Sequence, residues 1–367
     1  MTSARPRTVV AKIGTSSLTD DHGRIAPGAV EKLCAEVAEL RSGGDRVVVV
    51  TSAAISAGLP ALGMPRPHDL ATLQAVAAVG QSRLMRVYDE SLAPHDLVAG
   101  QVLLAPLDFT HRSQYLHARQ TIERLLELGV VPVVNENDAV ADDEIRYGDN
   151  DRLAALVSHL VGADVLVLLT DTAGLLTADP RFDSSASLIE EIVEIDHELE
   201  RVAGGAGTAR GSGGMASKLA AAKIAAWSGV RTVIAAATRP HVLRDALDGA
   251  PGVGTVVTPH DRRLPARKLW IAFATGSAGT VLVDDGARRA LVADGRSLLA
   301  AGVVGVEGGF GADAAVEVAG PDGTVFAKGL VGVSAVTLRE IAGRRTLDLP
   351  DGVPHEVIHR DDLVMVP

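Results

Sequence analysis

Two lysines of this chain lie beside glycine-rich turns, where an ammonium group can bind an anion. The chain has six lysines against 29 arginines, so lysine is not its usual source of positive charge. Lys12 belongs to an apolar segment, residues 8–13, that leads into Gly14. Burial of an unpaired ammonium group in such a segment is costly. Lys12 is therefore either an edge-strand lysine that reaches water or a charge held at the end of a central strand to meet an anion.

Lys218 ends a glycine-rich segment, residues 211–218, that opens an alanine-rich helix. Glycines that lead into a helix N-terminus, with a lysine in the first turn, are typical of a phosphate site. The alternative is a flexible loop with a solvated lysine, and the spacing excludes a Walker A motif. The turn at residues 14–17 (Gly-Thr-Ser-Ser) can form an anion cradle from successive N–H groups, or simply reverse the chain.

Polar side chains cluster in two further segments, residues 135–138 (Asn-Glu-Asn-Asp) and residues 148–151 (Gly-Asp-Asn-Asp). Such a cluster can bind a metal, orient lysines or hold the ammonium group of a zwitterionic ligand. Helix capping by Asp149 or Asn150 is the alternative for one of these residues, and an EF-hand is excluded. Residues 51–55 offer the Ser52 hydroxyl and free backbone amides to a carboxylate, unless Ser52 is a plain N-cap. Asp171 follows an apolar strand and can contact a nucleotide.

These residues require a scaffold in which strands and helices alternate from residue 8 to about residue 258. The predicted strands are residues 8–13, 46–51, 97–104, 130–135, 164–170 and 230–236, and the predicted helices are residues 29–41, 71–91, 113–128, 152–161 and 214–228. This alternation predicts an α/β fold with a mainly parallel sheet between two layers of helices. Ligands of such sheets bind beyond the carboxyl ends of the strands, where the polar segments lie.

The pattern changes after a polar, proline-bounded stretch at residues 259–267, which we interpret as a linker. We therefore expect a first domain at residues 1–258 and a second at residues 268–367. Short strands at residues 279–284, 303–307, 314–318 and 324–327, with helices near residues 287–293 and 336–342, predict a small, mostly β, barrel-like second domain.

Composition excludes several classes of function. The net charge of −11 does not favour nucleic acid or an anionic membrane as a partner. The single cysteine, Cys34, lies on the apolar face of a predicted helix, which indicates a buried structural thiol and excludes an intrachain disulfide. The N-terminus does not resemble a signal peptide, and no apolar run reaches the length of a transmembrane helix. We expect a soluble, cytoplasmic protein.

Paired lysines, glycine loops and strand-end carboxylates favour phosphoryl transfer, which depends on positioning and charge neutralisation. A carboxylate acceptor with a pKa of about 4.3 needs no general base at neutral pH. The main obstacle is then repulsion between acceptor and donor anions, which two ammonium groups and a magnesium ion would relieve.

Over nearly its full length the chain resembles the glutamate 5-kinase family of the amino-acid kinase superfamily. The segments that carry the resemblance are residues 10–16 (Val-Ala-Lys-Ile-Gly-Thr-Ser), 51–58, 78–81 (Ala-Val-Gly-Gln), 100–104 (Gly-Gln-Val-Leu-Leu), 135–138, 148–151, 169–171 (Leu-Thr-Asp) and 212–218. The C-terminal segment resembles the PUA domain that many members of the family carry.

The resemblance implies a three-layer amino-acid kinase fold and phosphorylation of the γ-carboxylate of L-glutamate by ATP with Mg²⁺, the first step of proline biosynthesis. It implies that Lys12 and Lys218 contact the phosphates and that Asp151 orients these two lysines. The implied glutamate-binding residues are Ser52, Asn135, Asp138, Asp149 and Asn150, with Asp138 suited to the ammonium group. The implied ATP-binding residues are Lys12, Gly14, Thr170, Asp171, Ser212, Gly213, Gly214, Met215, Ala216, Ser217 and Lys218.

The resemblance also implies inhibition by proline and assembly into dimers or tetramers, and it assigns no residue as a direct metal ligand. The sequence departs from the family pattern at Ala53, where glycine is common, and at residues 210–212. Ala53 is strained if that position requires a positive φ and harmless otherwise.

Three other functions fit parts of the sequence. The chain could be a kinase of N-acetylglutamate, aspartate or a nucleoside monophosphate, although residues 135–138 and 148–151 together favour free glutamate. It could bind RNA through the PUA-like segment, but residues 270–367 carry 8 Lys and Arg against 13 Asp and Glu, a net charge of −5. A non-catalytic amino-acid sensor would not require the two lysines.

Overall fold

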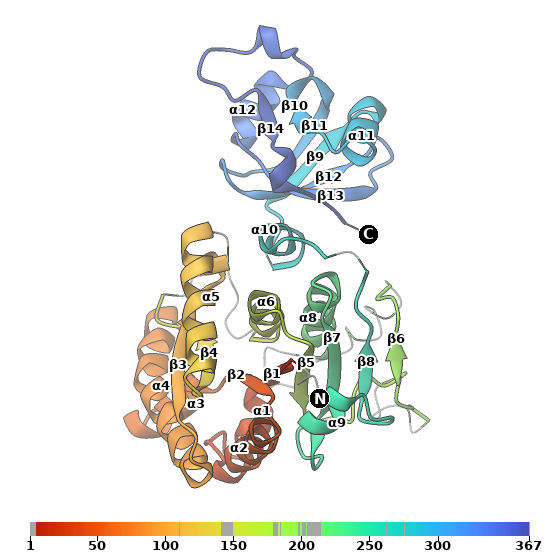
Figure 1. The fold of residues 1–367 in the computed structure, drawn as a ribbon. Helices are drawn as coiled ribbons and strands as arrows, with labels where there is room; N and C mark the ends of the chain where they lie inside the picture. Colours follow the sequence, from red (N-terminus) through yellow and green to blue (C-terminus); the bar gives the residue numbers. More distant parts are fainter. Residues whose placement is uncertain are drawn as a thin grey trace. The chain divides into compact units, whose positions relative to one another are not determined.

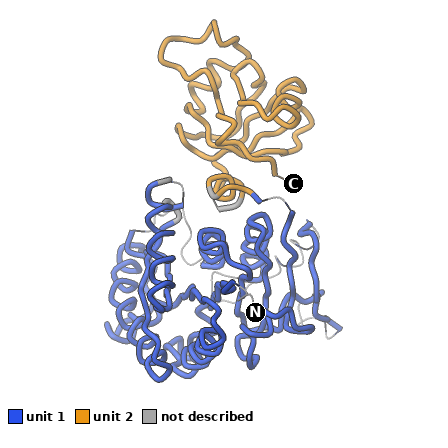
Figure 2. The backbone as a smooth tube through the Cα atoms, viewed as in Figure 1, with its two compact units in different colours: residues 1–263 blue, residues 264–367 orange. Residues whose placement is uncertain are grey.

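The computed structural model describes residues 5–109, 111–140, 150–178, 183, 185–196, 199, 203, 214–261, 263–274 and 276–366. The chain divides into two compact units, residues 1–263 and residues 264–367 (Figure 2). The division falls inside the segment that we interpret as a linker, and a short helix, α10, begins there at Ala266. Each unit has a hydrophobic core of its own.

A mainly parallel sheet forms the centre of the first unit (Figure 1). Its described strands are β1 (Thr8–Ile13), β2 (Arg46–Val50), β3 (Ala99–Leu104), β4 (Val131–Glu136), β5 (Val165–Thr170), β6 (Glu191–Ile192), β7 (Arg231–Ala236) and β8 (Thr255–Val257). They are ordered β3-β4-β2-β1-β5-β7-β8-β6, and β8 runs antiparallel to β7. The six predicted strands are confirmed to within two residues at each end, whereas β6 and β8 were too short to predict.

Helices cover both faces of this sheet, as βαβ crossovers require. The described helices are α1 (Thr15–Leu18), α2 (Pro27–Ser42), α3 (Ala54–Leu62), α4 (Leu70–Leu92), α5 (Arg112–Glu127), α6 (Asn150–Val161), α8 (Met215–Trp227) and α9 (Val242–Asp248). One face of β1, with Ala11 and Ile13, packs into the same core as α2, α4 and α9. Because side chains alternate along a strand, Lys12 points to the opposite face. Helix α6 contacts β1 and packs against α8.

Helices α3 and α4 cross at two glycines, Gly58 and Gly80. A Cβ atom on Gly80 would lie 1.8 Å from the carbonyl oxygen of Ala54, and one on Gly58 would lie 2.2 Å from that of Val76. Side chains at these positions would therefore push the helices apart. The close approach places the middle of α4 beside the first turn of α3.

The second unit is mostly β, as predicted. Its described strands are β9 (Gly279–Val283), β10 (Leu298–Leu299), β11 (Val303–Gly308), β12 (Ala315–Ala319), β13 (Val325–Leu330), β14 (Glu356–Ile358) and β15 (Leu363–Met365), and its helices are α10 (Ala266–Leu269), a π-helical turn (Trp270–Ala274), α11 (Asp285–Val292) and α12 (Ala335–Ile341). Five strands form a sheet in the order β11-β9-β12-β13-β15, and β10 pairs with β14. The apolar sides of these strands enclose the core with α11 and α12.

Candidate active site

Lys12 lies in the middle of the sheet. Its strand, β1, pairs in parallel with β2 on one side and β5 on the other, so it is not an edge strand. Only 4% of Lys12 is exposed. The interpretation of Lys12 as an edge-strand lysine that reaches water is therefore wrong, and its charge is compensated inside the protein.

Asp151 compensates that charge and also pairs with Lys218. Lys12 Nζ lies 2.5 Å from Asp151 Oδ1, and Lys218 Nζ lies 3.2 Å from Asp151 Oδ2. Ser217 Oγ donates a hydrogen bond to Asp151 Oδ2 at 2.7 Å. Asp151 sits in the first turn of α6, and Ser217 and Lys218 sit in the first turn of α8. The packing of α6 on α8 and β1 thus brings together three segments that are far apart in the sequence.

This buried cluster of Lys12, Asp151 and Lys218 carries a net charge of +1, which favours a bound anion. Burial alone would raise the pKa of Asp151, but the ammonium groups of Lys12 and Lys218 lower it to about 2. The carboxylate is therefore ionised at neutral pH. Gly14 lies beside this cluster, because a Cβ atom on it would be 3.3 Å from Lys12 Nζ.

A second polar cluster is built from side-chain amides. Asn150 Nδ2 lies 2.7 Å from the carbonyl oxygen of Thr51, 3.0 Å from Ser52 Oγ and 2.8 Å from Asn135 Oδ1. Asn135 Nδ2 in turn donates to Gln81 Oε1 at 2.8 Å. Asn150 directly precedes Asp151 in the first turn of α6. The amide cluster therefore lies next to the pair of lysines. The sequence had singled out the segment that holds Gln81 without giving that residue a role.

The loop between β2 and α3 has a left-handed residue. Ala53 is the N-cap of α3, with φ 78° and ψ 18°, and no side chain caps this helix. The interpretation of Ser52 as a plain N-cap is therefore wrong, and within the described part of the chain no side chain caps the first backbone N–H groups of α3. Ala53 does occupy the positive-φ conformation that glycine adopts without strain, at a cost of roughly 1–2 kcal/mol.

Asp138 lies just beyond the end of β4 and is half-buried. Burial raises the pKa of its carboxyl group to about 6. A carboxyl group whose charge is destabilised in this way gains from a cationic ligand, because the ligand restores the lost stabilisation of the charged form.

A cavity of about 450 Å³ lies at the carboxyl ends of β1 and β5. Among its lining residues are the expected nucleotide-binding residues Thr170 and Asp171, together with Ser16 and Ser17 of α1. Thr170 Oγ1 donates to Asp171 Oδ1 at 3.1 Å, and Thr170 is buried. The cavity also borders α2, through Lys32 and Glu36 among others, and it lies at the edge of the sheet where a parallel α/β fold binds ligands.

The remaining expected nucleotide-binding residues lie at the start of α8. Gly214 is its N-cap, without a side-chain cap, and Met215 and Ala216 open its first turn. Asp149, Ser212 and Gly213 lie outside the described residues, so the structure describes no contact for them.

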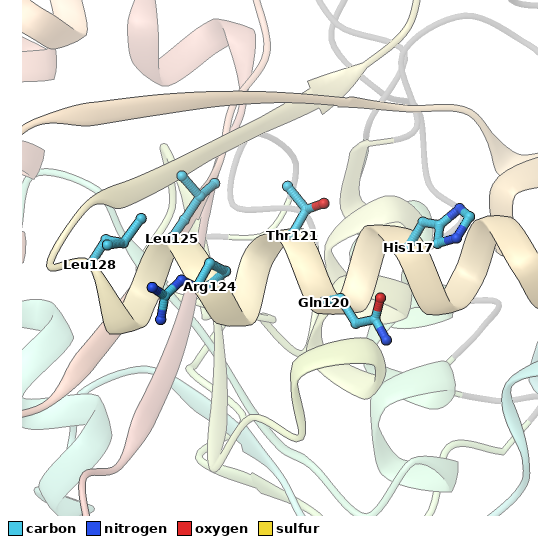
Figure 3. Close-up of a pocket in the computed structure, with 6 residues that line it drawn as sticks. All are labelled: His117, Gln120, Thr121, Arg124, Leu125 and Leu128. Atoms are coloured by element: carbon cyan, nitrogen blue, oxygen red, sulfur yellow. The ribbon is translucent and has the colours of Figure 1, made fainter.

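A second hollow, of about 500 Å³, runs along α5 (Figure 3). Figure 3 shows that its lining side chains project from α5 and from the residue just after it. They are His117, Gln120, Thr121, Arg124, Leu125 and Leu128. None of the expected site residues lines this hollow, so it is not the candidate active site.

The described residues contain neither a metal-binding group of side chains nor a membrane-spanning helix. Within them, no group of three or more His, Cys, Asp and Glu side chains could hold a metal ion. None of the helices in the same ranges is both long and apolar enough to span a membrane.

Known proteins resemble this chain over nearly its whole length. The amino acid kinase family matches residues 7–236, and the PUA domain matches residues 279–353. A protein of Geobacter sp. (strain M21) named glutamate 5-kinase is 46% identical over 363 residues, covering 98% of this chain and 97% of its own. The glutamate 5-kinase of Vibrio campbellii (strain ATCC BAA-1116) is 44% identical, covering 99% and 97%.

Among solved structures, the carbamate kinase from Giardia lamblia bound to AMP-PNP aligns with a TM-score of 0.50 at 19% identity. The alignment covers 70% of this chain and 99% of that chain. At this level of identity the likeness shows the fold alone.

Proposed function

Because this chain belongs to the glutamate 5-kinase family within the amino acid kinase family, we propose that it transfers the γ-phosphoryl group of ATP to the γ-carboxylate of L-glutamate. The products are γ-glutamyl 5-phosphate and ADP, and the reaction opens proline biosynthesis. The observation that carries the proposal is the buried cluster of Lys12, Asp151 and Lys218, which holds two ammonium groups on one carboxylate.

In the proposed reaction an oxygen of the γ-carboxylate attacks the γ-phosphorus, and the bond to the β–γ bridging oxygen breaks. The acceptor is already ionised at neutral pH, so no protein group has to remove a proton. Lys12 and Lys218 would neutralise charge on the transferring phosphoryl group, which is the main demand of this chemistry. Asp151 would hold both ammonium groups in position. Mg²⁺ enters as part of the nucleotide substrate.

Glutamate would bind where the amide cluster meets the first turn of α3. Ser52, Asn135 and Asn150 are joined there by hydrogen bonds. Uncapped N–H groups at a helix N-terminus suit a carboxylate of the substrate. Asp138 would bind its ammonium group, and we propose that Asp149 also contacts glutamate.

ATP would bind beside the lysine cluster. We propose contacts from Lys12 and Gly14, from Thr170 and Asp171 at the end of β5, and from residues 212–218. The support is that Gly14 adjoins Lys12 Nζ and that Thr170 and Asp171 line a cavity at the carboxyl ends of β1 and β5. Phosphates at the uncapped N-terminus of α8 would also gain from its dipole.

We assign catalysis to residues 1–258, a linker to residues 259–267 and a PUA-like domain to residues 268–367. We also propose a cytoplasmic location, where ATP and glutamate are available, inhibition by proline at or near the glutamate site, and assembly into dimers or tetramers. The net charge of −5 on residues 270–367 disfavours RNA as the main partner.

The test is to trap the acyl phosphate with hydroxylamine after incubating the purified protein with MgATP and one acid at a time. We expect the hydroxamate with L-glutamate and little with N-acetylglutamate or L-aspartate. A product with N-acetylglutamate but none with glutamate would reject the assignment and favour the nearest alternative kinase.

A further inference from the structure

We infer that Gln81 is a positioning residue for glutamate: it holds Asn135, which in turn accepts a hydrogen bond from Asn150 and keeps the Asn150 side chain in place. The observation is the direct hydrogen bond from Asn135 Nδ2 to Gln81 Oε1, at 2.8 Å, between buried side chains of α4 and β4. The inference rests on the proposed function, since it concerns the binding of the proposed substrate.

The direction of the hydrogen bonds follows from a backbone group. The carbonyl oxygen of Thr51 can only accept, so the atom of Asn150 that lies 2.7 Å from it must be the amide nitrogen. That nitrogen also faces Asn135 at 2.8 Å, so Asn135 must present its oxygen there. Asn135 then directs its own nitrogen to Gln81, which must present an oxygen.

The anchor of this chain of hydrogen bonds is itself fixed. Thr51 N donates to the carbonyl oxygen of Val134 at 2.8 Å, and Thr51 Oγ1 lies 2.8 Å from the buried hydroxyl of Tyr88. At the other end, Gln81 Nε2 donates to Gln101 Oε1 at 3.3 Å. Each amide between Thr51 and Gln101 therefore has one favourable orientation.

Gln81 is held in place by the helix crossing. Its neighbour Gly80 lies against Ala54 at the start of α3, where no side chain would fit. The exposed fractions of Gln81, Asn135 and Asn150 are 8%, 1% and 4%. Water is therefore a poor substitute for a missing partner at these positions, and a lost acceptor leaves a buried donor unsatisfied.

The orientation has a consequence for the substrate. With its nitrogen turned toward protein acceptors, Asn150 keeps Oδ1 as a buried atom that has no hydrogen-bond partner among the described residues. A ligand with an N–H donor would satisfy this oxygen, and L-glutamate has such donors in its ammonium group. Without the oxygen of Gln81, Asn135 Nδ2 becomes a buried donor that has lost its acceptor. The side chain of Asn135 is then held only by its hydrogen bond with Asn150, which loosens the position of both amides.

The experiment compares three single variants in the full-length protein. Q81M keeps the length of the side chain and removes the acceptor, Q81E keeps an oxygen that accepts from Asn135, and Q101M removes only the outer link. We expect Q81M to raise the KM for glutamate about tenfold with the KM for ATP changed less than about twofold. We expect Q81E and Q101M to stay within about threefold of the wild type. Q81A replaces Q81M if the latter does not fold.

A double-mutant cycle and a binding measurement complete the test. If Gln81 acts through Asn135, the Q81M/N135A variant should have the glutamate KM of N135A alone, because the two losses are then not additive. Calorimetric titration of glutamate should show the same loss of affinity in Q81M. Additive losses, or equal changes in the KM for glutamate and for ATP, would overturn the inference in favour of a general packing role.

Failure of this inference can be distinguished from failure of the proposed function. If the wild type forms the acyl phosphate and Q81M has an unchanged glutamate KM, the inference is wrong and the proposed function stands. If the wild type neither binds glutamate nor forms the acyl phosphate, both are rejected.

Discussion

Among the individual residues, the shared carboxylate of Asp151 has the greatest consequences. It pairs with Lys12 and with Lys218, and 1% of its side chain is exposed. A buried carboxylate stabilises two ammonium groups only while it is ionised, and its pKa of about 2 keeps it so at neutral pH. Both lysines are therefore stabilised by Asp151, and Asp151 is stabilised by both lysines. Substitutions in the cluster separate electrostatic effects from effects on glutamate binding.

Replacement of Lys218 by alanine should reduce turnover far more than it weakens glutamate binding. The variant lacks one of the two ammonium groups that we propose neutralise the transferring phosphoryl group, so kcat should fall about 10²–10³-fold. The glutamate KM should change less than about threefold, because the amide cluster is untouched. Steady-state kinetics check this, with Lys223→Ala on the same helix as the control. Equal changes in kcat and in glutamate KM would contradict it.

Replacement of Asp151 by asparagine should destabilise the fold. It removes the carboxylate that pairs with two buried ammonium groups, at a cost of about 3–5 kcal/mol in the free energy of unfolding at pH 7. Because the pKa of Asp151 is lowered in the folded state, its contribution is present above the ordinary pKa of 3.8 and is lost as the pH falls through about 2. Urea unfolding measures the change, and Asp89→Asn on the exposed side of α4 is the control. A loss no larger than that of the control would show that the lysines do not need Asp151.

Glutamate binding should weaken in acid because of Asp138. Its pKa is raised to about 6, so the carboxylate becomes protonated as the pH falls below that value and loses its attraction for an ammonium group. The KM for glutamate should therefore rise as the pH is lowered from 7 to 5, with an apparent pKa near 6. Asp138→Asn should show a high KM without this dependence. If the KM for glutamate depended on pH in the same way in the wild type and in Asp138→Asn, the titrating group would be on the nucleotide and not Asp138.

Among the secondary-structure elements, the crossing of α3 on α4 decides the shape of the region where we propose that glutamate binds. Gly80 and Gly58 let the helix backbones approach to a distance that no Cβ atom allows. The first turn of α3 and the middle of α4 therefore meet, and the loop that carries Ser52 lies within reach of residues on β4 and α6. Ala53 adopts a left-handed conformation in this loop, and its methyl group is buried in the core.

The importance of Gly80 at the crossing can be tested by comparing it with a glycine that has room for a methyl group. Gly80→Ala would put a methyl group 1.8 Å from the carbonyl oxygen of Ala54, and overpacking of this kind should cost about 3 kcal/mol. Gly28→Ala in the first turn of α2 meets no atom within 4 Å. That variant should be neutral or stabilising by up to about 1 kcal/mol, because alanine loses less entropy than glycine in a helix. Thermal unfolding of both variants checks the contrast, which would be absent if the two helices could separate freely.

For the full-length chain, the division into two units with separate cores determines which parts can exist alone. Residues 1–263 contain the complete described sheet of the kinase unit, in which β8 covers the edge of β7. Residues 264–367 have their own sheet and core. The family match ends at residue 236, before β8, so the match and the folding unit do not end at the same residue.

A truncated protein should fold only if it contains the whole folding unit, and not merely the residues that match the family. A fragment of residues 1–263 should fold and retain glutamate kinase activity, and a fragment of residues 264–367 should unfold cooperatively on its own. A fragment of residues 1–236 lacks α9 and β8, which exposes the edge of β7 and removes buried residues from the core, so it should aggregate. Circular dichroism and the hydroxamate assay distinguish these outcomes. Loss of activity in the 1–263 fragment would show that the second unit contributes to catalysis.

Much of the fold was predictable because its signals are local. Mostly apolar runs of six to eight residues between helical patterns located β1, β2, β3, β4, β5 and β7. The two-residue strand β6 and the three-residue strand β8 carry no such pattern, since their pairing depends on strands that are distant in the sequence. The candidate lysines were predictable for a related reason, because an ammonium group in an apolar strand and one at a glycine-rich helix start are unusual in themselves.

The order of strands and helices, the candidate residues at the strand ends and the family resemblance all follow from residue types and their spacing. The partners of those residues do not. That Asp151 lies between Lys12 and Lys218, that Gln81 reaches Asn135, and that position 53 has a positive φ depend on how α3, α4, α6 and α8 pack on the sheet. Periodicity reports which face of an element is buried, but the distance between two side chains depends on contacts across elements, and these exist only in the folded chain.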